Sequence, residues 1–419
     1  MQKLISSLIY SICLILLTLT LIKLNNIYLK TNIPFFKKES CKTLSEIIVT
    51  AKELDVSSDA KAPSSLHAKA YCLIDADSGQ ILIGHNENEK LPMASTTKIM
   101  TCIVALEHGN LNDTVTASSY AASMPDVQLN MKQGEKFLLK DLMYSLMLES
   151  HNDTAVAIAE HIGGSVEGFA KLMNDKAEEL GCTCTHFVTP NGLDDDEHFT
   201  TASDLCKIAC YAIQSKEFIK IIQTPSHSFM NKDNTKSYTV NNKDAFLKLY
   251  EGAMGIKTGF TGNAGYCFVG AAKRKNTTLI SSVLACGWPP NKSYKWSDTT
   301  SLMNYGFSKY TKRSITPDNI LPDIAVKDGI SKKLPIKRSS MDAFTILLTA
   351  SDKIKISYDV PQYINAPVRA GDIIGYERYS LNDKLYYEIP LVAGTSVKKA
   401  DTDFFTEILF KLFFMKYTD

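Results

Sequence analysis

Ser95 and Lys98 could form a nucleophile and its base. They are separated by two threonines and lead into an apolar helical run, so Lys98 lies one turn after Ser95 on the same helical face. A serine hydroxyl is a weak nucleophile that needs an adjacent base, and Lys98 is the candidate on this face. The pattern alone is weak, because it recurs at Ser58–Lys61 and Ser396–Lys399. Taken alone, Ser95 would be interpreted as a polar helix start.

Two later segments follow in an informative order. Ser150-His151-Asn152 lies between two apolar helical patterns, and Lys257-Thr258-Gly259 opens the segment leading into a predicted strand. Each has a plainer interpretation, as helix-capping residues or as an ordinary turn. The order Ser-x-x-Lys, Ser-x-Asn, Lys-Thr-Gly is nevertheless that of penicillin-binding proteins and class A β-lactamases. The combination therefore predicts serine acyl transfer.

Each residue type in this order meets a chemical need. Lysine has an unperturbed pKa of about 10.4, so Lys98 can act as a base near neutrality only where burial or a second cation disfavours its charge. Lys257 could supply that second charge. The helix N-terminus at Ser95 favours a developing oxyanion, and Gly259 permits close backbone approach. Lys257 and Thr258 offer a cation and a hydroxyl to a substrate carboxylate.

The elements that must position these residues predict an α+β domain. The runs Ala70–Asp75 and Gln80–Ile83 indicate a hairpin, and Gly265–Ala272 and Thr278–Cys286 indicate two more neighbouring strands. Helical patterns between them cover Ser95–Leu106, Leu138–Leu148 and Asn152–Ile162. Strands at both ends with helices between them predict one sheet that combines distant segments. Beyond about Lys312, short β-branched runs predict a small all-β domain.

The chain is predicted to have five parts. An apolar run from Leu4 to Leu24 predicts an export signal or a signal anchor. Lysines beyond this run oppose export by the positive-inside tendency, and the chemistry downstream outweighs them. The apolar spacing from Phe404 to Phe413 predicts an amphipathic membrane-associating helix, with a core-packing helix as the alternative. The predicted boundaries are 1–29 (signal), 30–65 (linker), 66–311 (catalytic), 312–399 (β-rich) and 400–419 (helix).

Composition excludes several classes of function. Lys+Arg 46 against Asp+Glu 45 gives a formal net charge of +1, which provides no general attraction to nucleic acid. The 10 cysteines lack the spacing of a disulfide framework or zinc site, so most are expected to be buried apolar side chains. The histidines show no ligand spacing and are expected in surface or core roles. No metal or cofactor is predicted.

Longer segments around these motifs resemble the low-molecular-weight penicillin-binding proteins, the D-alanyl-D-alanine carboxypeptidases of peptidase family S11. The similar segments in the predicted catalytic domain are Pro92–Thr101, Phe187–Asp195, Gly255–Thr261 and Ala264–Cys267. Those in the predicted β-rich domain are Ala366–Asp372 and Glu388–Ala393. The resemblance runs from about Ala70 to the end of the chain.

The resemblance implies a serine penicillin-binding fold and an acyl-enzyme mechanism. Ser95 would attack the carbonyl between two D-alanines, Lys98 would take its proton, and Ser150 would pass a proton to the departing D-alanine. The implied partners are peptidoglycan stem peptides, with β-lactams as covalent inhibitors, and a membrane surface. The implied location is outside the cytoplasm at the cell membrane.

The resemblance also implies how substrate is bound. Asn152 would hold the substrate backbone, and Lys257 with Thr258 would bind the terminal carboxylate. Gly259 would lie beside the substrate, and the N–H groups of Ser95 and Phe260 would bind the oxyanion. His151 occupies the middle of the Ser-x-Asn segment, where the family often has a smaller residue, and is expected at the pocket rim.

Three alternatives use the same residues. A class A β-lactamase needs a glutamate between the second and third motifs, and no Glu-x-x-x-Asn occurs there. A sensor or scaffold that binds without turnover would not need a nucleophile together with a base. A transpeptidase differs only in the acceptor of the acyl group, and the sequence leaves that alternative open.

Overall fold

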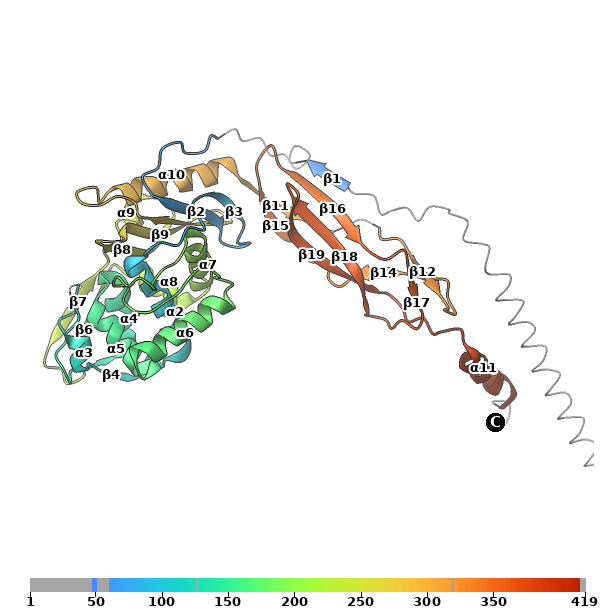
Figure 1. Cartoon of the computed structure of the whole chain (residues 1–419), viewed down its shortest axis with the longest axis horizontal. Coiled ribbons are helices and arrows are strands. Elements are labelled where there is room, and N and C mark those ends of the chain that lie inside the picture. The colour runs from blue at the N-terminus through green and yellow to red at the C-terminus, as the bar shows by residue number, and fades with distance from the viewer. Residues whose placement is uncertain (1–46, 51–59, 126, 318–319, 415–419) are drawn as a thin grey trace, which may run out of the picture. The chain divides into compact units, whose positions relative to one another are not determined.

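The computed structural model describes residues 47–50, 60–125, 127–317 and 320–414 (Figure 1). They fall into two compact units. The larger unit takes its residues from 51–316 and 343–352, and the smaller unit takes its residues from 1–50, 317–342 and 353–419.

A five-stranded antiparallel sheet lies at the centre of the larger unit. In spatial order its strands are β3 (Ile81–His85), β2 (Ala70–Asp75), β10 (Thr277–Leu284), β9 (Gly265–Arg274) and β8 (Ala253–Thr261). The predicted hairpin of β2 with β3 and the predicted neighbours β9 and β10 are both present. The sheet joins the two ends of this unit's sequence and leaves β8 at one edge.

Helices cover both faces of this sheet (Figure 1). Leu73 of β2 packs in the core beneath α10 (Tyr294–Lys309), whereas Cys72 and Ile74 pack in the core that includes α7 (Ala202–Ala212). This alternation follows from the two-residue period of a strand, and it makes β2 apolar on both faces. The predicted α+β class is confirmed.

The other helices lie mainly on the α7 face. They are the 3₁₀ turn η1 (Ala94–Thr97), α2 (Lys98–His108), α4 (Leu139–Tyr144), the π-helical turn η2 (Ser145–Glu149), α5 (Asn152–Gly163), α6 (Val166–Glu179) and α8 (Lys216–Gln223). The short elements are β4 (Thr114–Thr116), α3 (Ser119–Ala122), β5 (Lys136–Leu138), β6 (Ser226–Met230), β7 (Ser237–Asn241), α9 (Phe246–Leu249), β11 (Thr311–Ile315) and β15 (Phe344–Leu348). The helix predicted over Leu138–Leu148 is thus divided into α4 and η2.

The smaller unit is built from strands, as predicted. One sheet has the order β1 (Ile47–Thr50), β16 (Lys353–Asp359), β18 (Ile373–Leu381), β19 (Lys384–Ala393), β14 (Ile336–Arg338). The second has the order β13 (Lys333–Leu334), β12 (Ile324–Lys327), β17 (Tyr363–Asn365). Glu377 is fully buried and accepts hydrogen bonds from Arg338 and from Tyr379, which satisfies its charge inside the unit.

Two segments differ from the predicted boundaries. Ile47–Thr50, predicted as linker, pairs with β16 of the smaller unit. Its Ile-Ile-Val-Thr run suits a strand but is too short for periodicity to reveal it. The predicted boundary between residues 311 and 312 falls inside β11, which pairs with β15 in the larger unit. Strand pairing joins residues that are distant in sequence, so a change in composition could not locate either boundary.

The final helix, α11 (Thr402–Phe414), is present where an amphipathic helix was predicted. Its side chains Phe405, Ile408 and Phe410 are exposed. Among the described residues, no helix combines the length and apolar character needed to cross a bilayer. The predicted signal at 1–29 lies outside the described residues.

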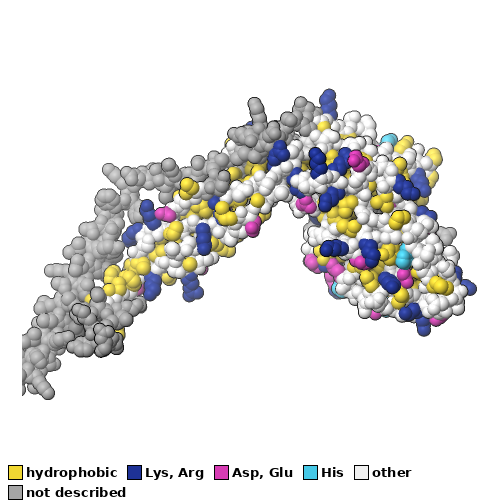
Figure 2. Space-filling view, turned by 180° about the vertical axis from the view of Figure 1, so that it is seen from behind, with side chains coloured by type: hydrophobic (Ala, Val, Ile, Leu, Met, Phe, Trp, Pro, Cys, Tyr) yellow, Lys and Arg dark blue, Asp and Glu magenta, His cyan; other side chains and the backbone are white. Residues whose placement is uncertain are grey.

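Charged side chains are mixed on the face of the larger unit that Figure 2 shows. Lysine and arginine side chains there are interspersed with aspartate and glutamate side chains. This mixture agrees with the nearly equal numbers of basic and acidic residues in the chain.

Candidate active site

The turn η1 presents Ser95 at the beginning of α2. Ala94 has a φ of 48°, in the left-handed region that non-glycine residues rarely occupy. The hydroxyls of Thr96 and Thr97 donate to the carbonyls of Met93 (2.6 Å) and Ala94 (2.8 Å). Local hydrogen bonds therefore hold the backbone on both sides of the serine.

Lys98 is completely buried and directed at Ser95. Its Nζ lies 2.9 Å from Ser95 Oγ, 2.8 Å from Asn152 Oδ1 and 2.6 Å from the Asn191 carbonyl oxygen. Burial, and then the charge of Lys257, lower the pKa of Lys98 well below its usual value. A neutral amine has two N–H groups, and these can donate hydrogen bonds to the two carbonyl oxygens. The lone pair of the nitrogen then faces the serine hydroxyl.

Ser150 occupies the junction between η2 and α5. It has a φ of 68°, and its buried Oγ has no hydrogen-bond partner among the described residues. Two residues later, Asn152 donates from Nδ2 to the Pro125 carbonyl (3.1 Å) and accepts from Lys98 at Oδ1. The second motif thus holds one side of the lysine and leaves one buried hydroxyl available to a ligand.

Strand β8 contains the whole Lys-Thr-Gly motif, which was predicted only to lead into a strand. Lys257 is buried and donates from Nζ to the Thr258 carbonyl (2.9 Å). Burial lowers the pKa of Lys257 to about 7, while Asp244 acts in the opposite direction. Asp244 accepts the backbone N–H groups of Phe246 and Ile256, which anchors it beside the strand.

Gly259 lies against the turn η1 that contains Ser95. A Cβ at this position would stand 3.0 Å from Ser95 N and 3.1 Å from the Met93 carbonyl oxygen. Glycine therefore permits β8 to approach η1 this closely. Phe260 follows Gly259 on β8 and is 43% exposed, and its ring lies tilted against that of Tyr266 with 4.6 Å between the ring centroids.

Comparison with known proteins agrees with this arrangement. The family model described as D-alanyl-D-alanine carboxypeptidase, Peptidase_S11, matches residues 56–287. The model of the penicillin-binding protein 5 C-terminal domain matches residues 311–399. This chain belongs to the D-alanyl-D-alanine carboxypeptidase family.

Relatives in this family cover most of the chain. D-alanyl-D-alanine carboxypeptidase DacF of Bacillus subtilis is 31% identical over 353 residues, which are 82% of this chain and 89% of the relative. The structure of penicillin-binding protein 5 from Haemophilus influenzae matches this chain with a TM-score of 0.67 and 27% sequence identity. The match covers 81% of this chain and 100% of the other. The structure of the Streptomyces K15 DD-transpeptidase matches with a TM-score of 0.56 and 32% identity. That match covers 59% of this chain and 99% of the other.

Family membership confirms the predicted fold class and the predicted serine-type carboxypeptidase function. Members of the D-alanyl-D-alanine carboxypeptidase family are hydrolases that act on the D-Ala-D-Ala ends of peptidoglycan peptides, typically through a serine acyl-enzyme, and they bind β-lactams. The prediction of a penicillin-binding-like domain followed by an all-β domain matches the two family models.

Three residues near the candidate site were not assigned a role from sequence. Asp153 accepts the backbone N–H groups of Leu129 and Met131 and is buried next to Asn152. The backbone carbonyl of Asn191 holds Lys98, a contact that no side-chain pattern could reveal. His198, which was expected only in a surface or core role, is hydrogen-bonded to the Thr97 hydroxyl in η1.

His151 is not at the pocket rim, where it was expected. It is 4% exposed, with Nδ1 2.8 Å from Ser145 Oγ and Nε2 3.3 Å from Glu149 Oε2. Burial is the main cause that lowers its pKa. The π-helical turn η2 brings Ser145 and Glu149 around the imidazole, and helical periodicity alone does not predict such a turn.

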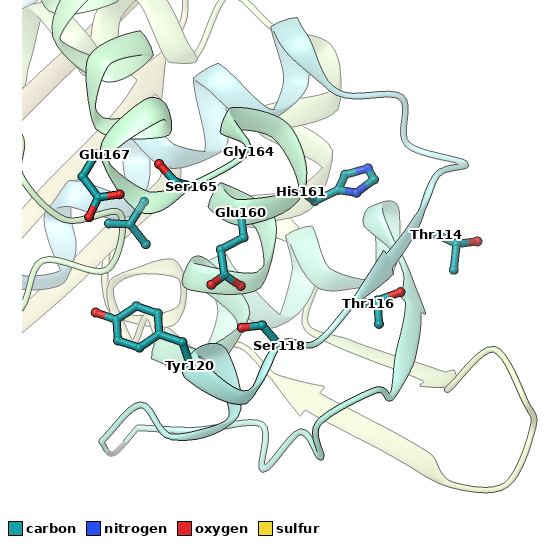
Figure 3. A pocket seen from close by; sticks show the side chains of 10 residues that line it. Thr114, Thr116, Ser118, Tyr120, Glu160, His161, Gly164, Ser165 and Glu167 are labelled. Carbon is teal, nitrogen blue, oxygen red and sulfur yellow. The ribbon is translucent and has the colours of Figure 1, made fainter.

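Other candidate sites in the described part of the chain are few. No group of three His, Cys, Asp or Glu side chains there could hold a metal ion, and the eight described cysteines are free thiols. A pocket of about 470 Å³ lies between β4, α3, α5 and α6, and Figure 3 shows the Glu160 carboxylate reaching toward Ser118 in it. None of the predicted site residues lines this pocket.

Proposed function

We propose that Ser95 is the nucleophile of this carboxypeptidase and that Lys98 is its base. The observation that carries the proposal is the fully buried Lys98 amine 2.9 Å from Ser95 Oγ, with its two other contacts made by carbonyl oxygens. The serine proton moves to Nζ while Oγ forms a bond to the carbonyl carbon of the penultimate D-alanine. The negative charge that develops on the carbonyl oxygen is bound by the N–H groups of Ser95 and Phe260.

The departing D-alanine must receive a proton as the C–N bond breaks. Ser150 supplies the path, because its buried hydroxyl has no other partner in the described structure and can bridge Lys98 to the leaving nitrogen. Asn152 holds the substrate backbone with its side-chain amide. A water molecule then attacks the ester, which releases the shortened peptide and restores the Ser95 hydroxyl.

Lys257 and Thr258 bind the carboxylate of the terminal D-alanine. Lys257 lies on the edge strand β8, where an extended peptide can lie alongside the backbone. Binding an anion favours the charged form of Lys257, whose pKa in the free protein is about 7. A β-lactam carries a carboxylate and a reactive carbonyl in a similar arrangement, so it acylates the same serine.

The first experiment is intact-protein mass spectrometry after benzylpenicillin treatment, followed over time. It is paired with D-alanine release from diacetyl-Lys-D-Ala-D-Ala. We expect a long-lived adduct on Ser95 together with D-alanine release, and we expect Ser95→Ala to abolish both. Ser396→Ala is the matched control, because it changes the serine of a second Ser-x-x-Lys segment.

The other outcomes identify the alternatives. Rapid drug turnover without D-alanine release would indicate a β-lactamase. An adduct without release would indicate a sensor or a transpeptidase, and release from Ser95→Ala would mean that a different residue is the nucleophile.

We infer that the protein works outside the cytoplasm at the membrane surface. The support is the apolar run at Leu4–Leu24 and the exposed apolar side chains of α11, including Phe405 and Ile408. The test is co-sedimentation with phosphatidylglycerol vesicles of the chain from residue 30, with and without residues 402–419. Equal binding by the two forms would exclude α11 as the membrane contact.

A further inference from the structure

His198 is a buried imidazole that joins two parts of the site. It is 3% exposed, and its Nδ1 accepts the backbone N–H groups of Val188 (2.9 Å) and Thr189 (3.3 Å). An accepting Nδ1 carries no proton, so in the neutral ring the proton is on Nε2. Nε2 lies 2.8 Å from Thr97 Oγ1 and therefore donates to it. Burial, the main cause, lowers the pKa of His198 to about 4, which keeps the ring neutral.

Thr97 continues this line of hydrogen bonds to the nucleophile. Its hydroxyl accepts from His198 and donates to the Ala94 carbonyl (2.8 Å). Ala94 directly precedes Ser95 and has the unfavourable φ of 48°. Such a conformation persists only where its surroundings hold it, and the Thr97 hydroxyl is one of the groups that do so.

The other side of the imidazole faces the loop that holds the base. Val188 and Thr189 begin the segment whose Asn191 carbonyl lies 2.6 Å from Lys98 Nζ. The same loop meets η1 at Gly192, where a Cβ would stand 2.0 Å from the Ala94 carbonyl oxygen. One ring thus contacts the Thr97 hydroxyl, which holds the backbone before Ser95, and the backbone of the loop that holds Lys98.

We propose that His198 is a positioning residue for acylation, which sets the orientation of Ser95 through Thr97 and the Ala94 carbonyl. This inference rests on the proposed role of Ser95 as the nucleophile. His198 does not contact the reacting atoms. Its donated hydrogen bond polarises the Thr97 hydroxyl and so strengthens the bond from Thr97 to Ala94.

Two substitutions of His198 separate this role from simple anchoring of the loop. In His198→Asn, the amide oxygen can replace Nδ1 as the acceptor for Val188, but no donor reaches Thr97. In His198→Gln, the longer amide can replace Nε2 as the donor to Thr97, but the acceptor for Val188 is lost. The measurement is benzylpenicillin acylation over a range of drug concentrations, which gives the acylation rate constant and the affinity before acylation separately.

We expect His198→Asn to lower the acylation rate constant about tenfold with the affinity unchanged, and His198→Gln to retain it within about twofold. The reverse order, Gln slower than Asn, would show that His198 only anchors the loop and would overturn the proposal. Unchanged acylation in His198→Asn would overturn it as well.

Thr97→Val provides a second test that leaves the histidine in place. It removes the hydroxyl at nearly constant volume, and we expect the same loss of about tenfold. Adding His198→Asn to Thr97→Val should cause no further loss, because both remove one connected path. Independent effects that multiply would contradict the proposal. Failure of the parent protein to form an adduct on Ser95 would instead contradict the proposed function.

Discussion

Two Ser-x-x-Lys segments with the same spacing lie in different parts of the fold. In the larger unit, Lys98 is completely buried and lies 2.9 Å from the Ser95 hydroxyl. In the smaller unit, Ser396 and Lys399 are both exposed. Ser396 Oγ accepts the backbone N–H of Ala370 (2.9 Å), a structural contact between two loops.

The difference indicates that burial of the amine, rather than the spacing, favours the neutral form that a base requires. Desolvation disfavours the ammonium form of Lys98, and a second buried lysine at the edge of the sheet adds to this effect. Lys98 is covered by α5, β8 and the loop around Asn191, which are all distant from it in sequence. No comparable set of elements buries Ser396 and Lys399, which are both exposed.

The largest predicted effect comes from removing the buried amine. Lys98→Met keeps an apolar side chain of similar length but removes the base, so we expect acylation by benzylpenicillin to fall by about 10³-fold or more. Lys399→Met is the matched change in the exposed segment and should leave acylation unchanged. Stopped-flow kinetics measure the acylation rate of both variants. Equal losses in the two variants would contradict the conclusion that burial distinguishes Lys98 from Lys399.

A smaller effect is expected where β8 meets η1. Gly259→Ala places a methyl group 3.0 Å from Ser95 N and should lower kcat/KM for D-alanine release by about 10²-fold. Gly262→Ala is the control, because nothing lies within 4 Å of a Cβ there. A fully active Gly259→Ala would show that β8 tolerates displacement from η1.

The two buried lysines also predict a pH dependence. Lys98 must be neutral, so kcat/KM falls as falling pH protonates it. Lys257 must be charged, so kcat/KM also falls as pH rises through its pKa of about 7. Asp244 raises the pKa of Lys257, so Asp244→Asn should move the alkaline limb to lower pH. A pH profile of D-alanine release measures this, and an unmoved limb would exclude Lys257 as its source.

The smallest predicted effect belongs to the exposed segment. Ser396→Ala removes the acceptor for the Ala370 N–H and should lower the free energy of unfolding by about 0.5 kcal/mol. Penicillin labelling and D-alanine release should not change. Denaturant unfolding measures the first quantity, and any loss of labelling would connect this segment to the catalytic reaction.

Much of the fold followed from local patterns. Sequence periodicity predicted elements that are present in the structure: the β2–β3 hairpin, the strands β9 and β10, and the helix that begins at Asn152. The β1 strand and the pairing of β11 with β15 were not predicted, because strand pairing depends on partners that are distant in sequence. The π-helical turn η2 was missed for a related reason, since its side chains are held by tertiary contacts.

The sequence by itself determined the family and the identity and order of the motif residues. It also predicted Lys98, one helical turn away, as the base for Ser95. Only the tertiary structure decided which of the Ser-x-x-Lys segments contains a buried amine, and that His198 contacts Thr97 in η1. The physical reason is that a pKa depends on desolvation and nearby charge, and both are set by residues that come together only on folding.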